Sequence, residues 1–258
     1  MRIQVLVAAM NQTDSSLVKK MNIKTDAIIG NQCDRNLIEK FEFGNQSVIY
    51  LNFAERGVGL NRNNALMRAD GDVCLFADDD MVYTDDYATI IENAYKEIPD
   101  ADVIIFNLIE KESVRYIIQK PTRVNKLNFL RYGAARISFR LSSVRANGIY
   151  FNQCFGGGTE YSHGEDNIFL SDCLKKGLKV YAYPAYIATL TDERPSTWES
   201  DNIEKYIKDQ GVLYRQISRK WWRLLCLQDA LRRHKSYGRS FFYTYRLMTE
   251  RRKTRDDA

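Results

Sequence analysis

The sequence lacks the features that mark several classes of protein. Its five cysteines are odd in number and form no C-x-x-C pair, so neither a disulfide framework nor a zinc knuckle is indicated. No apolar run approaches the roughly 18 residues that a membrane-spanning helix needs. The apolar stretch at residues 3–10 is too short, and too polar at its flanks, for a signal peptide. We therefore expect a cytoplasmic chain with reduced thiols.

The composition is that of a globular chain. Its 258 residues, 45% hydrophobic and 28% charged, supply one large α/β domain or two small ones that share a cleft. In the first 110 residues, short β-rich apolar runs alternate with polar, helix-like segments. The runs are residues 3–9, 27–30, 48–51, 73–77 and 103–109. This alternation predicts a mostly parallel sheet covered by helices.

Two helices have clear ends in the sequence. The first is predicted to begin after Thr84, an N-cap followed by two aspartates, and to end at Pro99. The second runs from about Asp166 to Lys176 and is closed by Gly177 in the C-cap position. Short strands are predicted at residues 136–140 and 179–183, and helices from residue 202 onward.

Three adjacent carboxylates, Asp78, Asp79 and Asp80, directly follow the apolar run at residues 73–77. They stand at the carboxyl end of a predicted strand, where ligands bind in open α/β sheets. The adjacent anions repel one another, and a hard divalent cation such as Mn²⁺ or Mg²⁺ offsets that repulsion, above all when it also holds a substrate diphosphate. Asp78 and Asp80 project to the same side of an extended chain, so both are candidate metal ligands. The alternative is a solvated acidic turn before a helix.

A second carboxylate pair, Glu165 and Asp166, lies between a glycine-rich stretch at residues 156–158 and the start of the second predicted helix. A carboxylate at a helix N-terminus is stabilised in its charged form, which suits a group that accepts a proton. Both residues are therefore candidates for a general base. For Asp166, an ordinary acidic N-cap is the alternative.

Together these features resemble glycosyltransferase family 2. The shared series is an N-terminal strand, an apolar strand that ends in D-x-D, and a glycine-rich loop that ends in Glu-Asp, over roughly residues 1–200. Residues 62–66 are similar to the family's R-N-x-G-L helix, and residues 69–72 to its lead into the metal strand. Residues 28–34 look like a variant of the family's nucleotide-base loop, in which Asn31 and Gln32 replace an acidic pair.

The resemblance implies an α/β, GT-A-like (Rossmann-like) fold, with a mostly parallel mixed sheet flanked by helices and a helical C-terminal extension. Residues 1–110 would form the nucleotide-sugar-binding half, residues 111–197 the acceptor-binding half and residues 198–258 the basic extension. The implied reaction moves a sugar, with inversion, from a nucleoside-diphosphate donor to a hydroxyl of a glycan or lipid-linked acceptor. A UDP-sugar is the expected donor, and surface polysaccharide synthesis the expected setting.

The resemblance also implies a role for each site residue. Asp80 would be the principal metal ligand, and Asp78 would lie near the metal and the ribose. Asp166 would be the general base, with Glu165 as the alternative, while Arg62 would neutralise charge on the leaving diphosphate. The implied nucleotide-binding set comprises Asn31, Gln32, Arg62, Asp78 and Asp79.

The chain departs from the family in one respect, since many members add a metal-binding histidine downstream of the Glu-Asp pair. The only histidines here are His163 and His234, and neither has a suitable position. Asp192 could substitute, although a turn acid is the more ordinary interpretation. His163 could instead bind the acceptor or cap its loop.

Positive charge is concentrated near the C-terminus. Residues 215–255 carry a net charge of +11, whereas residues 1–214 carry −4. The stretch at residues 219–225 (RKWWRLL) mixes cationic and aromatic side chains, which predicts a helix on an anionic membrane surface, such as the inner face of the plasma membrane. The alternative is a helix packed on the main domain with a solvated basic face. Nucleic acid is not an expected partner, because no recognisable binding module accompanies the segment.

Two other functions fit part of the sequence. Residues 78–82 also satisfy the D-x-D-x-[TV] motif of haloacid-dehalogenase-type phosphatases, which would use Asp78 as a nucleophile together with Asp80. That motif normally lies on the first strand, however. A non-enzymatic adaptor that binds anions or membranes through its tail is the other alternative, and it leaves the ordered motifs unexplained.

Overall fold

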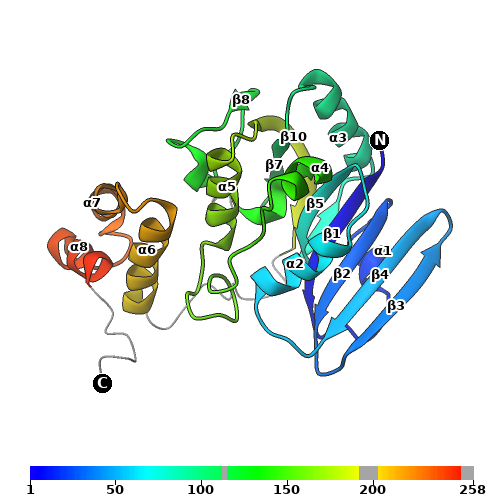
Figure 1. Ribbon diagram of the computed structural model, residues 1–258, viewed down its shortest axis with the longest axis horizontal. Helices are drawn as coiled ribbons and strands as arrows, with labels where there is room; N and C mark the ends of the chain where they lie inside the picture. The colour runs from blue at the N-terminus through cyan, green and yellow to red at the C-terminus, as the bar shows by residue number, and fades with distance from the viewer. Residues whose placement is uncertain (112–114, 192–202, 251–258) are drawn as a thin grey trace.

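In the part of the chain that the structure describes, ten strands form one mixed sheet with helices on both faces (Figure 1). The computed structural model describes residues 1–111, 115–191 and 203–250. The strands are β1 (Ile3–Met10), β2 (Asp26–Gln32), β3 (Leu37–Phe43), β4 (Gln46–Phe53), β5 (Val73–Asp78), β6 (Met81–Tyr83), β7 (Val103–Ile109), β8 (Thr122–Arg123), β9 (Ile137–Arg140) and β10 (Val180–Leu190).

The order across the sheet is β3-β4-β2-β1-β5-β9-β7-β10-β6, and β8 pairs with β10 beside this path. The pairings of β1 with β2 and β5, of β2 with β4, and of β7 with β10 are parallel. The antiparallel pairings involve the edge strand β3 and the short strands β6, β8 and β9. The carboxyl ends of β1, β2 and β5 therefore meet at one edge of the sheet.

The helices are α1 (Leu17–Lys20), α2 (Val58–Arg68), α3 (Tyr87–Glu97), α4 (Leu141–Ala146), α5 (Glu165–Lys175), α6 (Ile203–Ile217), α7 (Trp222–Arg233) and α8 (Phe241–Thr249), with 3₁₀ turns η1 (Phe129–Arg131) and η2 (Ala134–Arg136).

The central strands are buried on both faces, so they form two apolar cores. Successive strand side chains point to opposite faces. Leu6 and Phe76 therefore belong to a core shared with α2, α4, α5 and α6, whereas Val5 and Leu75 belong to a core covered by α1 and α3. Burial on both faces explains why β1 and β5 are continuous apolar runs rather than alternating ones.

The predicted fold class is confirmed. The five apolar runs of the first 110 residues are β1, β2, β4, β5 and β7, and the predicted strand near residues 136–140 is β9. Helix α5 ends at Lys175, and Gly177, two positions later, has a φ of +84°, the left-handed conformation expected of the glycine that follows a helix. The last described region is helical, as predicted.

The start of the first predicted helix was wrong. Helix α3 begins at Tyr87, with Asp86 in the N-cap position, so Thr84 is not the cap. The hydroxyl of Thr84 instead donates to the carbonyl of Ile187 at 3.3 Å, which ties this segment to β10. The Thr84 hydroxyl therefore forms a tertiary hydrogen bond instead of capping the helix.

Other strands also differ from prediction. Strand β10 continues to Leu190, well past the predicted end at residue 183. Pro184 lies where the β7–β10 register shifts, which is the kind of irregularity that tolerates proline inside a strand. Strand β3 was not predicted, because its apolar residues form neither a continuous run nor a strict alternation, and this edge strand is mostly exposed. The short strands β6 and β8 were not predicted either.

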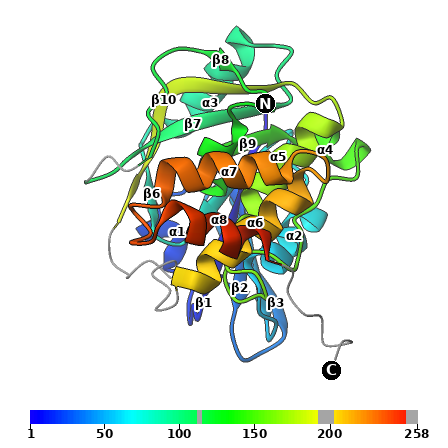
Figure 2. The same cartoon turned by 90° about the vertical axis from the view of Figure 1, so that its left-hand side faces the viewer.

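Helices α6, α7 and α8 pack against one another beside the sheet domain, with α6 next to α5 and α7 and α8 on the outside (Figures 1 and 2). Ile207, Leu213 and Ile217 of α6 belong to the same core as Leu6 and Phe76. The extension therefore shares a core with the sheet. Within the described ranges, no helix is both long and apolar enough to cross a membrane.

Candidate active site

The carboxyl ends of three parallel strands bring the predicted nucleotide and metal residues together. Ala8 of β1 pairs with Asp78 of β5, and Met10 of β1 pairs with Gln32 of β2. Residues that follow these pairs must lie at the same edge of the sheet. This is the edge at which open α/β sheets bind their ligands.

Arg62 of α2 links the two carboxylate motifs. Its Nη2 donates to Asp78 Oδ1 at 2.6 Å and its Nη1 donates to Glu165 Oε1 at 2.8 Å. The side chains of Arg62 and Glu165 are only 4% and 3% exposed, whereas that of Asp78 is 40% exposed. One buried cation therefore joins residues that are 16 and 103 positions away in the chain.

The charges around Arg62 explain why a guanidinium can be buried here. Burial opposes its charge, but Asp78 and Glu165 outweigh that effect and raise the pKa of Arg62. The ring of Phe151 lies 5.3 Å from its guanidinium carbon. Asn63 holds Phe151 in place, because its side-chain amide exchanges hydrogen bonds of 2.9 and 2.8 Å with the backbone of Phe151.

The glycine-rich loop packs directly on Glu165. Gly156 has φ +103°, and a Cβ placed there would lie 2.5 Å from Val58 Cγ1 and 2.8 Å from Glu165 Oε2. The loop backbone also binds the start of α2, since Val58 N donates to Gly157 O at 3.1 Å. Only a residue without a side chain allows the loop to approach both groups.

We predict that Gly156→Ala destabilises the protein by about 1–3 kcal/mol through overpacking and strain at positive φ. Urea unfolding of the variant measures this loss. Gly157→Ala is the matched control, because a Cβ at Gly157 meets no atom within 4 Å. Equal urea midpoints for the two variants would contradict the close packing proposed for Gly156.

Asp166 stands at the start of α5 and remains partly exposed. Its Oδ1 accepts a hydrogen bond from the Asn167 backbone N–H at 2.6 Å. Burial and the neighbouring Glu165 raise the pKa of Asp166 to about 7, although Arg62 acts in the opposite direction. A carboxyl group that titrates near neutral pH is suited to exchange protons with a substrate.

Asp80, just after β5, is a second carboxyl at this edge of the sheet with a raised pKa. Burial is the largest cause, followed by Asp78 and Asp79, and together they raise the pKa of Asp80 to about 6. Its Oδ1 is buried and has no hydrogen-bond partner among the described residues. Such an oxygen is costly unless a cation or a proton satisfies it.

These carboxylates fit a hard divalent cation in part. Asp78 and Asp80 supply oxygen ligands of the kind that Mg²⁺ and Mn²⁺ prefer. Within residues 1–111, 115–191 and 203–250, no cluster of three or more Asp, Glu, His or Cys side chains has a metal-binding arrangement. The remaining ligands would have to come from a substrate diphosphate and water.

Gln12 is a site residue that the sequence analysis missed. Its backbone N–H and C=O bind the side-chain amide of Asn31 at 2.9 and 2.8 Å, and its Nε2 lies 3.3 Å from Asp79 Oδ2. Asp79 Oδ2 also accepts from Met10 N at 3.2 Å. In the sequence, the one feature that could have indicated Gln12 is its position just after the first strand.

Asn31 and Gln32 are both buried, and their amides bind protein groups. Asn31 Nδ2 also donates to Asn52 Oδ1 at 2.7 Å, and Gln32 Oε1 accepts from Gly57 N at 2.8 Å. These two residues therefore hold Gln12 and the N-terminus of α2 in place.

His163 lies where the segment that precedes α5 contacts α6. Its ring stacks on Tyr206 with centroids 4.2 Å apart, and its Nε2 lies 2.8 Å from Gln210 Oε1. The backbone N–H of Ser162 donates to Asp209 Oδ2 at 3.0 Å. His163 thus packs this segment against the C-terminal helices. Asp192 lies outside the described residues.

A mixed sheet of this order, with D-x-D at the end of β5 and Glu-Asp at the start of α5, defines a GT-A-like glycosyltransferase fold. The family model "Glycosyl transferase family 2" matches residues 25–158. The chain belongs to this family and is a glycosyltransferase. The phosphatase and adaptor alternatives are therefore wrong.

Solved structures of S. aureus TarS share the fold. TarS 1–349 in complex with UDP-GlcNAc is 17% identical with a TM-score of 0.63, covering 97% of this chain and 76% of that one. TarS 1–349 in complex with UDP is 16% identical with a TM-score of 0.62, covering 92% and 72%. None of the curated protein sequences compared with the chain matches it.

Proposed function

We propose that the protein transfers a sugar from a nucleoside-diphosphate donor, with UDP as the expected nucleotide, to a hydroxyl of a glycan or lipid-linked acceptor. The observation that carries this proposal is the Arg62 bridge between Asp78 and Glu165. It draws together the two motifs whose carboxyls, Asp80 and Asp166, have pKa values raised toward neutrality. The TarS structures that share the fold hold UDP-GlcNAc and UDP, which supports a UDP-sugar donor.

The nucleotide is proposed to lie across the ends of β1, β2 and β5. Asn31 and Gln32 would act there by holding Gln12 and Gly57 in place. Asp79 contributes through Gln12 in the same way. The half-buried Gln12 amide is well placed to contact a bound base or ribose.

Asp80 is proposed as the principal metal ligand, with Asp78 beside it. A bound Mn²⁺ or Mg²⁺ ion would stabilise negative charge on the diphosphate as it leaves. Arg62 adds fixed positive charge at the same place, and its two carboxylate partners keep it oriented.

Asp166 is proposed as the general base. It is partly exposed, whereas Glu165, the alternative, is buried and held by Arg62. Deprotonation of the acceptor hydroxyl by Asp166 would let the oxygen attack the sugar carbon from the face opposite the diphosphate, which inverts the anomeric centre.

We predict that Asp80→Asn lowers sugar transfer at least about 100-fold, because charge stabilisation by a metal is worth several kcal/mol in the transition state. Release of UDP from a panel of UDP-sugars, followed with Mn²⁺ present, measures this effect. Asp85→Asn is the control, since Asp85 is an exposed acid paired with Lys24. Wild-type turnover in Asp80→Asn would exclude the proposed metal site.

We also propose that α7 binds an anionic membrane surface, which would place the enzyme at the cytoplasmic face of a membrane in surface polysaccharide synthesis. Trp221, Leu224 and Leu231 are 55–58% exposed. At about 100° per residue they fall on one side of the helix, opposite the buried Cys226 and Ala230. Exposed apolar groups within a basic segment are the features of an interfacial helix.

In a flotation assay at low salt, the wild type should float with anionic vesicles. Replacing Trp221, Leu224 and Leu231 together by serine should abolish flotation, as should about 1 M salt, which screens charge within about 3 Å. Leu127→Ser is the control, because Leu127 is 94% exposed and lies outside the extension. A wild-type protein that stays at the bottom at low salt would refute the membrane proposal.

A further inference from the structure

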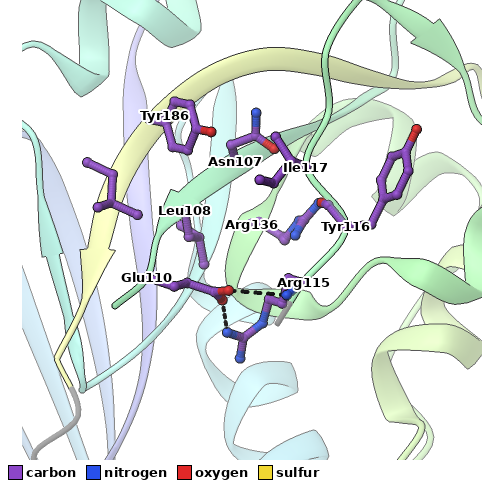
Figure 3. A pocket seen from close by; sticks show the side chains of 9 residues that line it. Asn107, Leu108, Glu110, Arg115, Tyr116, Ile117, Arg136 and Tyr186 are labelled. Carbon is purple, nitrogen blue, oxygen red and sulfur yellow. Dashed lines mark hydrogen bonds and ion pairs between the residues drawn. The ribbon is translucent and has the colours of Figure 1, made fainter. Parts of the chain in front are cut away.

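A pocket of about 370 Å³ lies at the carboxyl end of β7 (Figure 3). Its walls come from β7, from Tyr186 of β10, and from residues 115–117 and Arg136. In the sheet order, β1, β2 and β4 lie on one side of β5 and its aspartates, and β7 and β10 lie on the other. The pocket is therefore on the opposite side of the metal carboxylates from the proposed nucleotide site.

Arg136 is an unusual lining residue because it is almost completely buried and has no ion pair with an acid among the described residues. Its residue exposure is 2%. Its Nη2 donates to the carbonyl of Tyr116 at 2.9 Å, but its Nε has no hydrogen-bond partner among the described residues. Burial lowers the pKa of Arg136 to about 10. A buried guanidinium with an open donor favours an anion in the adjoining space.

The other lining charges that the structure describes pair with each other and do not compensate this cation. Glu110 is the acid that lines it, and Glu110 forms an ion pair with Arg115, which also lines it (Figure 3). These two residues act in opposite directions on the pKa of Arg136. A further cation, Arg131, lies over the ring of Tyr116 with its guanidinium carbon 4.5 Å from the ring centroid. The lining is therefore net positive.

The same short segment connects the pocket to Asp166. A Cβ on Gly133 would lie 3.3 Å from Asp166 Oδ2, so Gly133 forms the wall beside this carboxyl. The carbonyl of Tyr132 accepts from Asn167 Nδ2 at 3.3 Å, and the Tyr132 ring lies 5.4 Å from the guanidinium carbon of Arg136. Only three positions, spanned by the 3₁₀ turn η2, separate Gly133 from Arg136. Residues 132–136 therefore contribute both to the surroundings of Asp166 and to the pocket, so we expect an acceptor whose hydroxyl meets Asp166 to extend toward the pocket.

We propose that this pocket binds an oxyanion, a phosphate or a carboxylate, carried by the acceptor, with Arg136 as its principal donor. This inference rests on the proposed transferase function and adds that the acceptor is an anionic glycan. Arg136 would determine acceptor specificity and would leave donor binding unchanged. Figure 3 shows the aromatic groups Tyr116 and Tyr186 at the sides of the pocket, where they can contact a sugar ring that carries the anion.

The test measures the melting temperature of the full chain against inorganic phosphate, and separately against acetate, at constant ionic strength. Saturating UDP and Mg²⁺ are present, so that the proposed diphosphate site is occupied. One or both anions should raise the melting temperature of the wild type, and the one that does identifies a phosphate-bearing or a carboxylate-bearing acceptor. Arg136→Gln should weaken the apparent Kd at least about tenfold, the effect of losing one charge-assisted hydrogen bond.

Two further variants keep the test decisive if Arg136→Gln folds poorly. Ile117→Glu, at a position that is 45% exposed, adds a negative charge to the pocket and should abolish the rise in melting temperature with the anion. Ile117→Gln, whose side chain has the shape of glutamate without its charge, should retain most of that rise. Arg123→Gln is the control for general loss of positive charge, because Arg123 is exposed and contacts Tyr181 instead.

The outcomes separate this inference from the proposed function. No response of the wild type to either anion, or an equal response in Ile117→Glu, would overturn the pocket. Failure of UDP to bind would reject the nucleotide site, and the anion titration without nucleotide would still report on Arg136.

Discussion

Replacement of Asp166 by asparagine is expected to lower the rate of sugar transfer roughly 10²–10⁴-fold, the usual contribution of a general base, while UDP binding is retained. Asparagine preserves the shape of the side chain and removes the ability to accept the hydroxyl proton. Initial rates with a competent donor and acceptor, combined with calorimetric titration of UDP, measure both quantities on the same variant.

The pH dependence provides an independent check. Because the pKa of Asp166 is raised to about 7 and the base works in its ionised form, the wild-type rate should rise with pH through neutrality and then level off.

The same pKa shift means that the folded state binds the proton of Asp166 more tightly than the unfolded state does, so ionisation of Asp166 lowers the free energy of unfolding as the pH rises from about 4 to about 7. Asp166→Asn should therefore raise the free energy of unfolding at pH 8. Wild-type turnover by Asp166→Asn would mean that another residue is the general base, and Glu165 would be the first candidate.

Replacement of Arg62 by methionine should destabilise the protein by about 3–5 kcal/mol, because removal of one partner leaves the other as an uncompensated buried charge. That partner is Glu165, whose side chain is 3% exposed and whose Oε2 already lacks a hydrogen-bond partner among the described residues. Urea unfolding measures the loss. Arg68→Met on the same helix is the control, because Arg68 is exposed, donates to Asn64, lies over the ring of Phe53 and has no ion pair among the described residues.

The double variant Arg62→Met with Glu165→Gln tests the cause of this loss. A neutral glutamine needs no counter-ion, so part of the stability should return. A double variant no more stable than Arg62→Met alone would mean that the loss comes from packing against Phe151 rather than from the unpaired carboxylate.

The two carboxylate motifs could be predicted because their members are adjacent in sequence and follow recognisable elements. The bridge between them could not, because Arg62 reaches Glu165 across 103 positions, and no local pattern reveals which buried groups share a cation. Gln12 was missed for a related reason: its role comes from hydrogen bonds to Asn31, which the fold alone brings near.

The fold was predictable where burial is strongest. Strands β1 and β5 are apolar on both faces, so their sequence is distinctive. Strand β3 is an exposed edge, and β10 contains Pro184, so propensity and pattern fail for both. Arg136 was one of many basic residues in a region without clear periodicity, and only its burial in the folded chain distinguishes it.

Calorimetric titration of UDP into the wild-type protein, first with Mn²⁺ and then with EDTA, tests the central claim most directly, because the proposed site requires metal and diphosphate to bind together. The account predicts binding with Mn²⁺ and a large loss of affinity in EDTA. Equal affinity in the two conditions, or no binding of UDP, GDP or other nucleoside diphosphates in either, would contradict it.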